Sequence, residues 1–196
     1  MRARFGILVL VLGLAITTIG CGAPPTADID AAKAAITNAT TSGATDYAAP
    51  SMKAAEDAQA ALDAELKAQE GKWFKSYDKA KQLAADAKAA GEKAAADAAT
   101  GKEKAKADAT QAIADAKAAL TETEGLLAKA PKGKGSAADI AAMKTDLTTA
   151  GTAVTDAEAA LGNGKFLDAK AKAESAKSAA AAVKTAVEEA KAAKKK

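Results

Sequence analysis

The stretch that decides the fold is residues 136–193, SAADIAAMKTDLTTAGTAVTDAEAALGNGKFLDAKAKAESAKSAAAAVKTAVEEAKAA. Apolar residues recur in it at alternating spacings of three and four, the heptad pattern of helices that pack along a seam. A tight turn, Gly162-Asn-Gly164, separates two such seams, so this segment is predicted to be an antiparallel coiled-coil hairpin. The seam residues are Ile140, Met143, Leu147, Ala150, Val154, Ala157 and Leu161, then Phe166, Ala169, Ala173, Ala176, Ala180, Val183, Val187 and Ala190.

The preceding segment, residues 26–130, is also predicted to be helical. Alanine dominates it, and alanine is the best helix former because it loses no side-chain entropy in a helix. Two further seams, over residues 77–98 and 109–127, are out of phase with each other. The linker 131–135 separates this region from the hairpin. The whole chain is therefore predicted to be all-α, an elongated alanine-rich bundle of five to six helices.

Several residues are expected to interrupt the helices of this N-terminal region. Gly101 lies between its two seams, and an interior glycine costs about 1 kcal/mol relative to alanine, so a bend or break is expected there. Pro50 is expected to end or kink the first helix, and Ser51 to cap the second. Gly71 marks a turn.

The composition leaves few groups that could carry out chemistry. The chain has no histidine, the commonest general base and metal ligand. Its acids lie among lysines at helical spacings, as in Asp63–Lys67 and Asp168–Lys172, which is typical of exposed helix faces. We therefore expect no enzymatic activity, no cofactor and no metal site.

Residues 1–20 have the features of a lipoprotein signal peptide. Two arginines precede an apolar run of about a dozen residues, which is shorter than the roughly 20 that span a bilayer. Thr18-Ile-Gly-Cys21 resembles a lipobox, the motif after which the cysteine is acylated, with palmitate for example, and the chain is cut. Cys21, the lone cysteine, is thus the predicted lipidation site, and residues 21–25 form a tether. An uncleaved anchor and an ordinary secretory signal are the alternatives.

The lipobox resemblance also implies a location. Gly22 stands where an aspartate would favour retention in the inner membrane, so we expect the periplasmic face of the outer membrane. Removal of residues 1–20 would remove both arginines and leave lysines and the 25 acids nearly balanced. A nearly neutral body does not favour polyanions, so nucleic acid is not an expected partner.

Four short motifs lie within residues 26–98: Gly43-Ala44-x-x-Tyr47-Ala-Ala-Pro50, Ala60-Ala-Leu62, Glu65-Leu-Lys-Ala-Gln-Glu70 and Trp73-Phe74-x-x-Tyr77-x-Lys79-Ala80. With them the chain resembles the bacterial envelope family catalogued as domain of unknown function 4398. It departs from that family by having two alanines, not one, between Tyr47 and Pro50. The resemblance implies a small helical domain, often on a lipoprotein, without an established activity, and it assigns a role to no residue.

Trp73, Phe74 and Tyr77 are the candidate contact residues. Aromatic residues make up only 3% of the chain, so three within five positions form a conspicuous cluster. We expect them to be buried plugs at a helix turn, because large aromatic side chains bury the most apolar surface. The alternative is a platform for a ligand or glycan.

The chain ends in Lys-Ala-Ala-Lys-Lys-Lys196. An acylated N-terminus, alanine-rich seams and a terminal lysine resemble the murein lipoprotein family, in which that lysine is joined to peptidoglycan. Lys196 is therefore a candidate linkage residue, and peptidoglycan a candidate partner. The alternative is that these lysines complement a helix dipole and keep the terminus soluble.

These observations predict a non-enzymatic cell-envelope lipoprotein, either a structural spacer or a helical protein–protein interaction module in the periplasm. The alternative is a ligand- or glycan-binding, peptidoglycan-associated lipoprotein that uses the Trp73/Phe74/Tyr77 cluster. The expected partners are the membrane, through the lipid on Cys21, and a helical envelope protein or a second copy of the chain.

Overall fold

The computed structural model describes residues 23–130 and 136–193, and helices account for 89% of them. These residues contain no strand, so the all-α prediction is confirmed. The helices are α1 (Thr26–Thr41), α2 (Ala44–Tyr47), α3 (Ala49–Glu70), α4 (Asp78–Ala128), α5 (Ser136–Gly162) and α6 (Phe166–Ala193).

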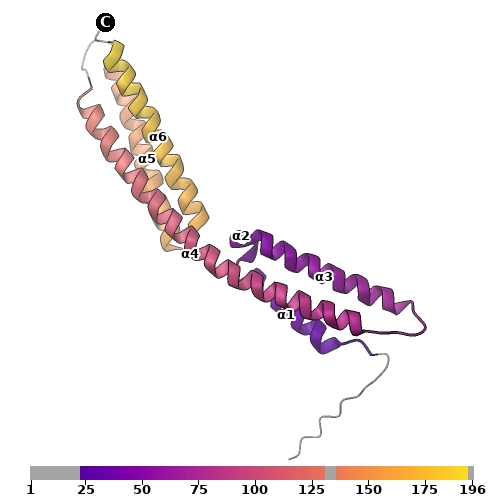
Figure 1. Cartoon of the computed structure of the whole chain (residues 1–196). Helices are drawn as coiled ribbons and strands as arrows, with labels where there is room; N and C mark the ends of the chain where they lie inside the picture. Colours follow the sequence, from indigo (N-terminus) through magenta and orange to yellow (C-terminus); the bar gives the residue numbers. More distant parts are fainter. Residues whose placement is uncertain (1–22, 131–135, 194–196) are drawn as a thin grey trace, which may run out of the picture.

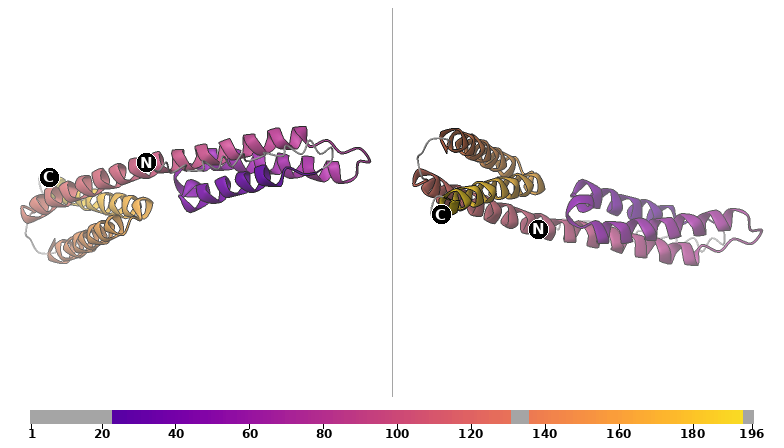
Figure 2. Two further views of the ribbon diagram at one scale, coloured as in Figure 1. Left: turned by 90° about the horizontal axis from the view of Figure 1, so that it is seen from below. Right: turned by 90° about the horizontal axis from the view of Figure 1, so that it is seen from above.

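Helix α4 is the axis of an elongated molecule. Its 51 residues extend for about 75 Å at the rise of an α-helix. Helices α1 to α3 pack along its first half and α5 and α6 along its second half, so two bundles share one helix (Figures 1 and 2). The predicted hairpin of α5 and α6 is present, but it has α4 as a third helix, which the sequence did not indicate.

The N-terminal bundle has a core of small side chains. Ile29 of α1 and Leu62 of α3 pack with alanines of α4. A Cβ atom at Gly91 would lie 2.8 Å from the backbone of Ala35 and Ile36 in α1. Glycine at this position therefore allows the α1 and α4 backbones to touch.

The C-terminal bundle buries most of the predicted seams of α5 and α6 against α4. Ile140, Met143 and Leu161 are only partly buried, and Ala190, near the end of α6, is exposed, so its assignment to the seam is wrong. Leu147, Val154, Val183 and Val187 lie in one core cluster with residues of α4. Thr123 interrupts the apolar seam of α4, yet it is 1% exposed. Its hydroxyl donates to the carbonyl of Ala119 within α4 and lies 3.3 Å from the Ala180 carbonyl of α6, so the buried oxygen is satisfied.

A ladder of ion pairs connects α4 and α6. The partners are separated by the same distance in sequence in each pair, so these two helices run parallel. The steps of seven residues place the pairs along the flank of the seam, as in coiled coils. The pairs are Lys170 with Asp108 at 3.4 Å, Lys177 with Asp115 at 2.9 Å, and Lys184 with Glu122 at 2.6 Å.

The expected interruptions of the N-terminal region are only partly present. Helix α4 continues through Gly101, so the prediction of a break there is wrong. The helix does bend, because Figure 1 shows its two halves running in different directions. Pro50 lies in the first turn of α3, where its missing N–H does not matter, and it begins a helix instead of ending one. Ser51 is not the N-cap; its hydroxyl donates to the Asp97 carboxylate of α4.

The two bundles meet at a small apolar junction near the middle of α4. Phe166 at the start of α6 is buried there with Ala105 and Ala109 of α4, and Tyr47 of α2 packs against the same cluster. The Tyr47 side chain is thus a part of the N-terminal bundle that packs against this junction. This contact and the continuous α4 connect the bundles.

Candidate functional site

The most exposed large apolar side chains of the described residues lie together in one loop. Trp73 is 92% exposed and Phe74 is 88% exposed. Both belong to residues 71–77, which connect α3 to α4 at one end of the molecule and are called the tip loop below (Figure 1). The prediction that they are buried plugs is wrong for these two residues, because the loop extends past both helices and no helix covers it.

Tyr77 lies at the base of the same loop and behaves differently. It is the residue before α4 begins, it is half-buried, and it packs against the cluster that contains Ile29 and Leu62. The structure therefore separates the predicted cluster. Trp73 and Phe74 are available to a partner, and Tyr77 is largely part of the core.

A buried polar network fixes the base of the tip loop. Gln69, near the end of α3, is 4% exposed, and its amide forms hydrogen bonds with both Glu65 and Ser76. Its Nε2 donates to Glu65 Oε1 at 2.6 Å, and its Oε1 accepts from the backbone N–H of Ser76 at 3.2 Å. Lys79 of α4 then pairs with Glu65 Oε2 at 2.8 Å. The network connects α3, the loop and α4 through the buried side chains of Glu65 and Gln69 and the largely exposed side chain of Lys79.

The charge of Glu65 is stabilised by this arrangement. Hydrogen bonds from Lys79 and from Gln69 lower the pKa of the Glu65 carboxyl below its ordinary value, against the opposing effect of burial. A carboxylate held ionised by a lysine and an amide is a structural anchor. It is poorly suited to general acid catalysis, which needs a raised pKa.

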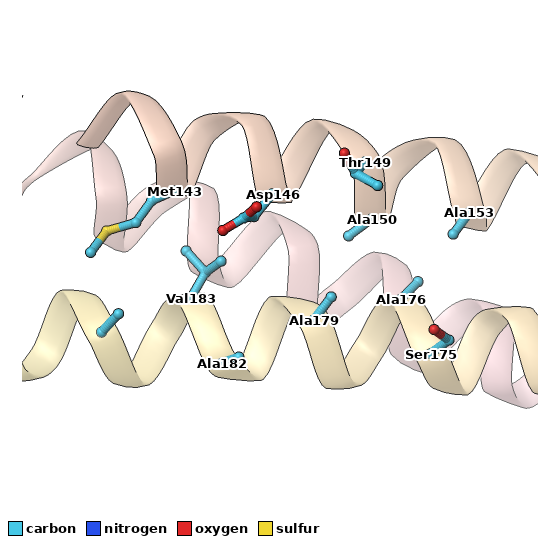
Figure 3. A pocket seen from close by; sticks show the side chains of 11 residues that line it. Met143, Asp146, Thr149, Ala150, Ala153, Ser175, Ala176, Ala179, Ala182 and Val183 are labelled. Atoms are coloured by element: carbon cyan, nitrogen blue, oxygen red, sulfur yellow. The ribbon is translucent and has the colours of Figure 1, made fainter. Parts of the chain in front are cut away.

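A second candidate surface is the groove between α5 and α6, of about 370 Å³. Figure 3 shows its lining coming from both helices, with α4 behind them. Alanines make up most of the lining, and Asp146 is the charged group in it. The groove is a shallow surface between closely packed small residues, and it does not gather polar groups that could bind or transform a small molecule.

The described residues contain no group of three or more side chains with metal-ligating spacing. Within the same residues, no helix combines the length and the apolar character that crossing a membrane requires. Cys21 and Lys196, the predicted lipidation and peptidoglycan-linkage residues, lie outside the described residues, as does the linker 131–135.

Comparisons of the chain with protein-family models, with curated proteins and with solved structures found no match. The resemblance of residues 26–98 to the envelope family named above therefore stays a prediction.

Glu65 and Gln69 were not predicted from the sequence to be members of a site. Their spacing of four places them on one face of α3, but many acids and amides of this chain have such spacing, as in Gln59–Asp63. Only the return of the loop over α3 buries this particular pair. Helical spacing does not distinguish it from the exposed pairs, and the Glu65–Glu70 motif of the family resemblance assigns no role to either residue.

Proposed function

We propose that this chain is a non-enzymatic cell-envelope lipoprotein, anchored through Cys21 to the periplasmic face of the outer membrane, that acts as a helical spacer. The observation that carries the proposal is the position of the start of α1. It lies at the tip-loop end of the molecule, and the C-terminal bundle lies at the other end of the continuous helix α4 (Figure 1). A lipid on Cys21 would thus hold one end, and the second bundle would extend into the periplasm.

The surface of the body supports a spacer more than an enzyme. The chain has no histidine, and its acids pair with lysines on helix faces, as Lys53 does with Asp57 and Lys88 with Glu92. Such pairs favour solubility and helix formation. The lipid would supply the membrane affinity, because two or more acyl chains anchor a protein stably.

Localisation with three forms of the chain tests the anchor. The unchanged chain should incorporate labelled fatty acid and fractionate with the outer membrane. Cys21→Ser should remove the label and leave the protein in the periplasm or as an uncleaved precursor. Gly22→Asp is the matched control, because it should keep the label and shift the protein toward the inner membrane. Label that persists in Cys21→Ser, or retention of this variant on membranes after a salt wash, would contradict the proposal.

A second candidate function is glycan binding by the tip loop, and the exposure of Trp73 and Phe74 favours it. Aromatic faces open to solvent can stack on sugars, and Trp73 is the lone tryptophan, so its fluorescence reports binding directly. Saturable quenching or a spectral shift on addition of soluble peptidoglycan fragments would support this function. An unchanged spectrum across the titration would contradict it.

A further inference from the structure

We propose that the tip loop is a second membrane contact, in which Trp73 and Phe74 enter the interface between lipid headgroups and acyl chains beside the lipid on Cys21. This inference rests on the proposed lipid anchor. It adds a binding site of the protein's own side chains and commits to a bilayer surface as the partner.

The two aromatic residues of the tip loop are unusually exposed. Among the described residues only Leu167, at 48%, joins Trp73 and Phe74 as an exposed large hydrophobic side chain. Two adjacent aromatic rings that are almost fully exposed stand out in a chain where aromatic residues are scarce. Tryptophan is enriched where membranes meet water, because its ring is apolar and its N–H can bond to headgroups or water.

The tip loop lies at the same end of the molecule as the start of α1, which follows the predicted lipid site Cys21 (Figure 1). Ile29, in the first turn of α1, packs in one cluster with Leu62 and Ala80, close to the residues that frame the tip loop. Residues 21–25 can span at most about 18 Å when fully extended. An acylated Cys21 therefore holds the start of α1 close to the bilayer, and the tip loop lies at the same end of the molecule (Figures 1 and 2).

The charged side chains around the tip loop include both lysines and acids. Lys72 and Lys75 flank the aromatic pair and are exposed, so their ammonium groups can extend to lipid phosphates. Acids also lie at this end, Glu70 and Asp78 beside the loop and Asp28 and Asp30 on α1, so the surface is mixed in sign. Insertion of the aromatic rings, and not attraction to anionic lipid, should therefore provide most of the contact.

The base of the tip loop is held in place by hydrogen bonds. Gln69 holds the Ser76 backbone and is itself held by Glu65, so the loop is fixed at the point where it leaves the bundle. A fixed base presents the two rings with a smaller loss of conformational freedom on insertion. A lipid at the start of α1 and a second contact at the loop would restrict the tilt of the molecule and direct α4 away from the membrane.

The full acylated chain in lipid vesicles tests the contact through the fluorescence of Trp73. In vesicles of phosphatidylethanolamine, with and without phosphatidylglycerol, Trp73 emission should shift to shorter wavelength. Lipids with brominated acyl chains should quench it, and aqueous acrylamide should lose most of its access. The quenching should be similar in neutral and anionic vesicles, and a signal that needs anionic lipid would contradict ring insertion.

The matched control moves the tryptophan away from the membrane. The double variant Trp73→Ala/Leu167→Trp keeps one tryptophan but places it at an exposed site near the junction of the two bundles. Its emission should be unaffected by brominated lipid and remain open to acrylamide. Equal quenching of both proteins would overturn the inference, because it would indicate a molecule lying flat.

The two proposals fail in different ways. A chain that carries no acyl group by mass spectrometry overturns the lipid anchor and this inference with it. An acylated, vesicle-bound chain whose Trp73 stays open to acrylamide overturns only the inference. Protection of Trp73 by peptidoglycan fragments but not by vesicles would also overturn it, in favour of glycan binding.

Discussion

Gly101 of α4 lies directly against the carbonyl group of Tyr47, the last residue of α2. A Cβ atom at position 101 would overlap the Tyr47 oxygen and lie 3.0 Å from the Tyr47 carbonyl carbon. The absence of a side chain at this point lets the short helix α2 rest on α4, which in turn places the Tyr47 ring against the cluster that contains Phe166.

We predict that Gly101→Ala destabilises the protein although alanine is the better helix former. The gain in helix propensity is about 1 kcal/mol, and the overlap with Tyr47 should cost about 1–3 kcal/mol. Gly125 is the matched control, because it lies in the same helix and a Cβ there would meet nothing within 4 Å. Gly125→Ala should stabilise by up to about 1 kcal/mol. Denaturant unfolding followed by circular dichroism measures both, and stabilisation by both variants would show that α2 does not rest on α4.

The contact between Gly101 and Tyr47 shows why α4 could be predicted only in part from the sequence. Its two seams were predicted over residues 77–98 and 109–127 because apolar spacing along one helix is a local property. The predicted seam positions within α4 are indeed buried, whereas Tyr77, at its N-cap, is half-buried. Gly101 was expected to bend or break the helix because helix propensity is also local. Its partner, Tyr47, is distant in sequence, and nothing in the neighbourhood of Gly101 reveals that another backbone needs the space.

We expect single core residues to have large effects, because alanines fill most of the core and contribute little burial each. Leu147 is 5% exposed in the C-terminal core cluster. Leu147→Ala should lower the free energy of unfolding by about 2–4 kcal/mol. The control, Leu167→Ala at the exposed start of α6, should change it by no more than about 0.5 kcal/mol. Equal effects of the two substitutions in denaturant unfolding would contradict the packing of α5 against α4 and α6.

We predict that the ion-pair ladder acts mainly on register. The hydrogen bond from Lys177 lowers the pKa of Asp115, but both side chains are partly exposed, so the pair should contribute little. Lys177→Glu should lower the melting temperature by less than Leu147→Ala does, and added salt should reduce the difference. The exchange Lys177→Asp/Asp115→Lys should recover most of the loss. A loss that neither salt nor the exchange reduces would mean that packing, and not charge, is responsible.

The tip loop shows a second limit of prediction from sequence. Trp73 and Phe74 were recognised as candidate contacts from their residue type, but they were expected to be buried because aromatic side chains usually are. Burial of a loop residue depends on whether the loop folds back over its helices. Here Ser76 folds back onto Gln69 and Tyr77 packs into the core, while the two residues at the apex do not. The fold class depends on periodicity and was predictable, whereas the exposure of the apex depends on this tertiary contact.

The last prediction concerns the effect of pH on the Glu65 network at the base of the tip loop. The pKa of Glu65 is lowered in the folded protein by Lys79 and then by Gln69. The contribution of Glu65 to stability is therefore fully present above the ordinary carboxyl range, about pH 4, and is lost as the pH falls through the lower folded value. Protonation should release Lys79 and loosen the loop, which raises the mobility of Trp73. Fluorescence anisotropy of Trp73 should consequently decrease on acidification before the helical signal is lost.

Glu65→Gln separates this effect from general acid unfolding. The variant removes the charge and keeps the shape of the side chain, so Trp73 anisotropy should be low already at neutral pH and should change little on acidification. Asp97 is a suitable comparison, because Lys93 and Ser51 lower the pKa of its carboxyl at a distance from the tip loop. Asp97→Asn should reduce the acid dependence of global stability and leave the anisotropy profile of Trp73 unchanged. If Glu65→Gln and Asp97→Asn shift that profile equally, the Glu65 network does not hold the loop.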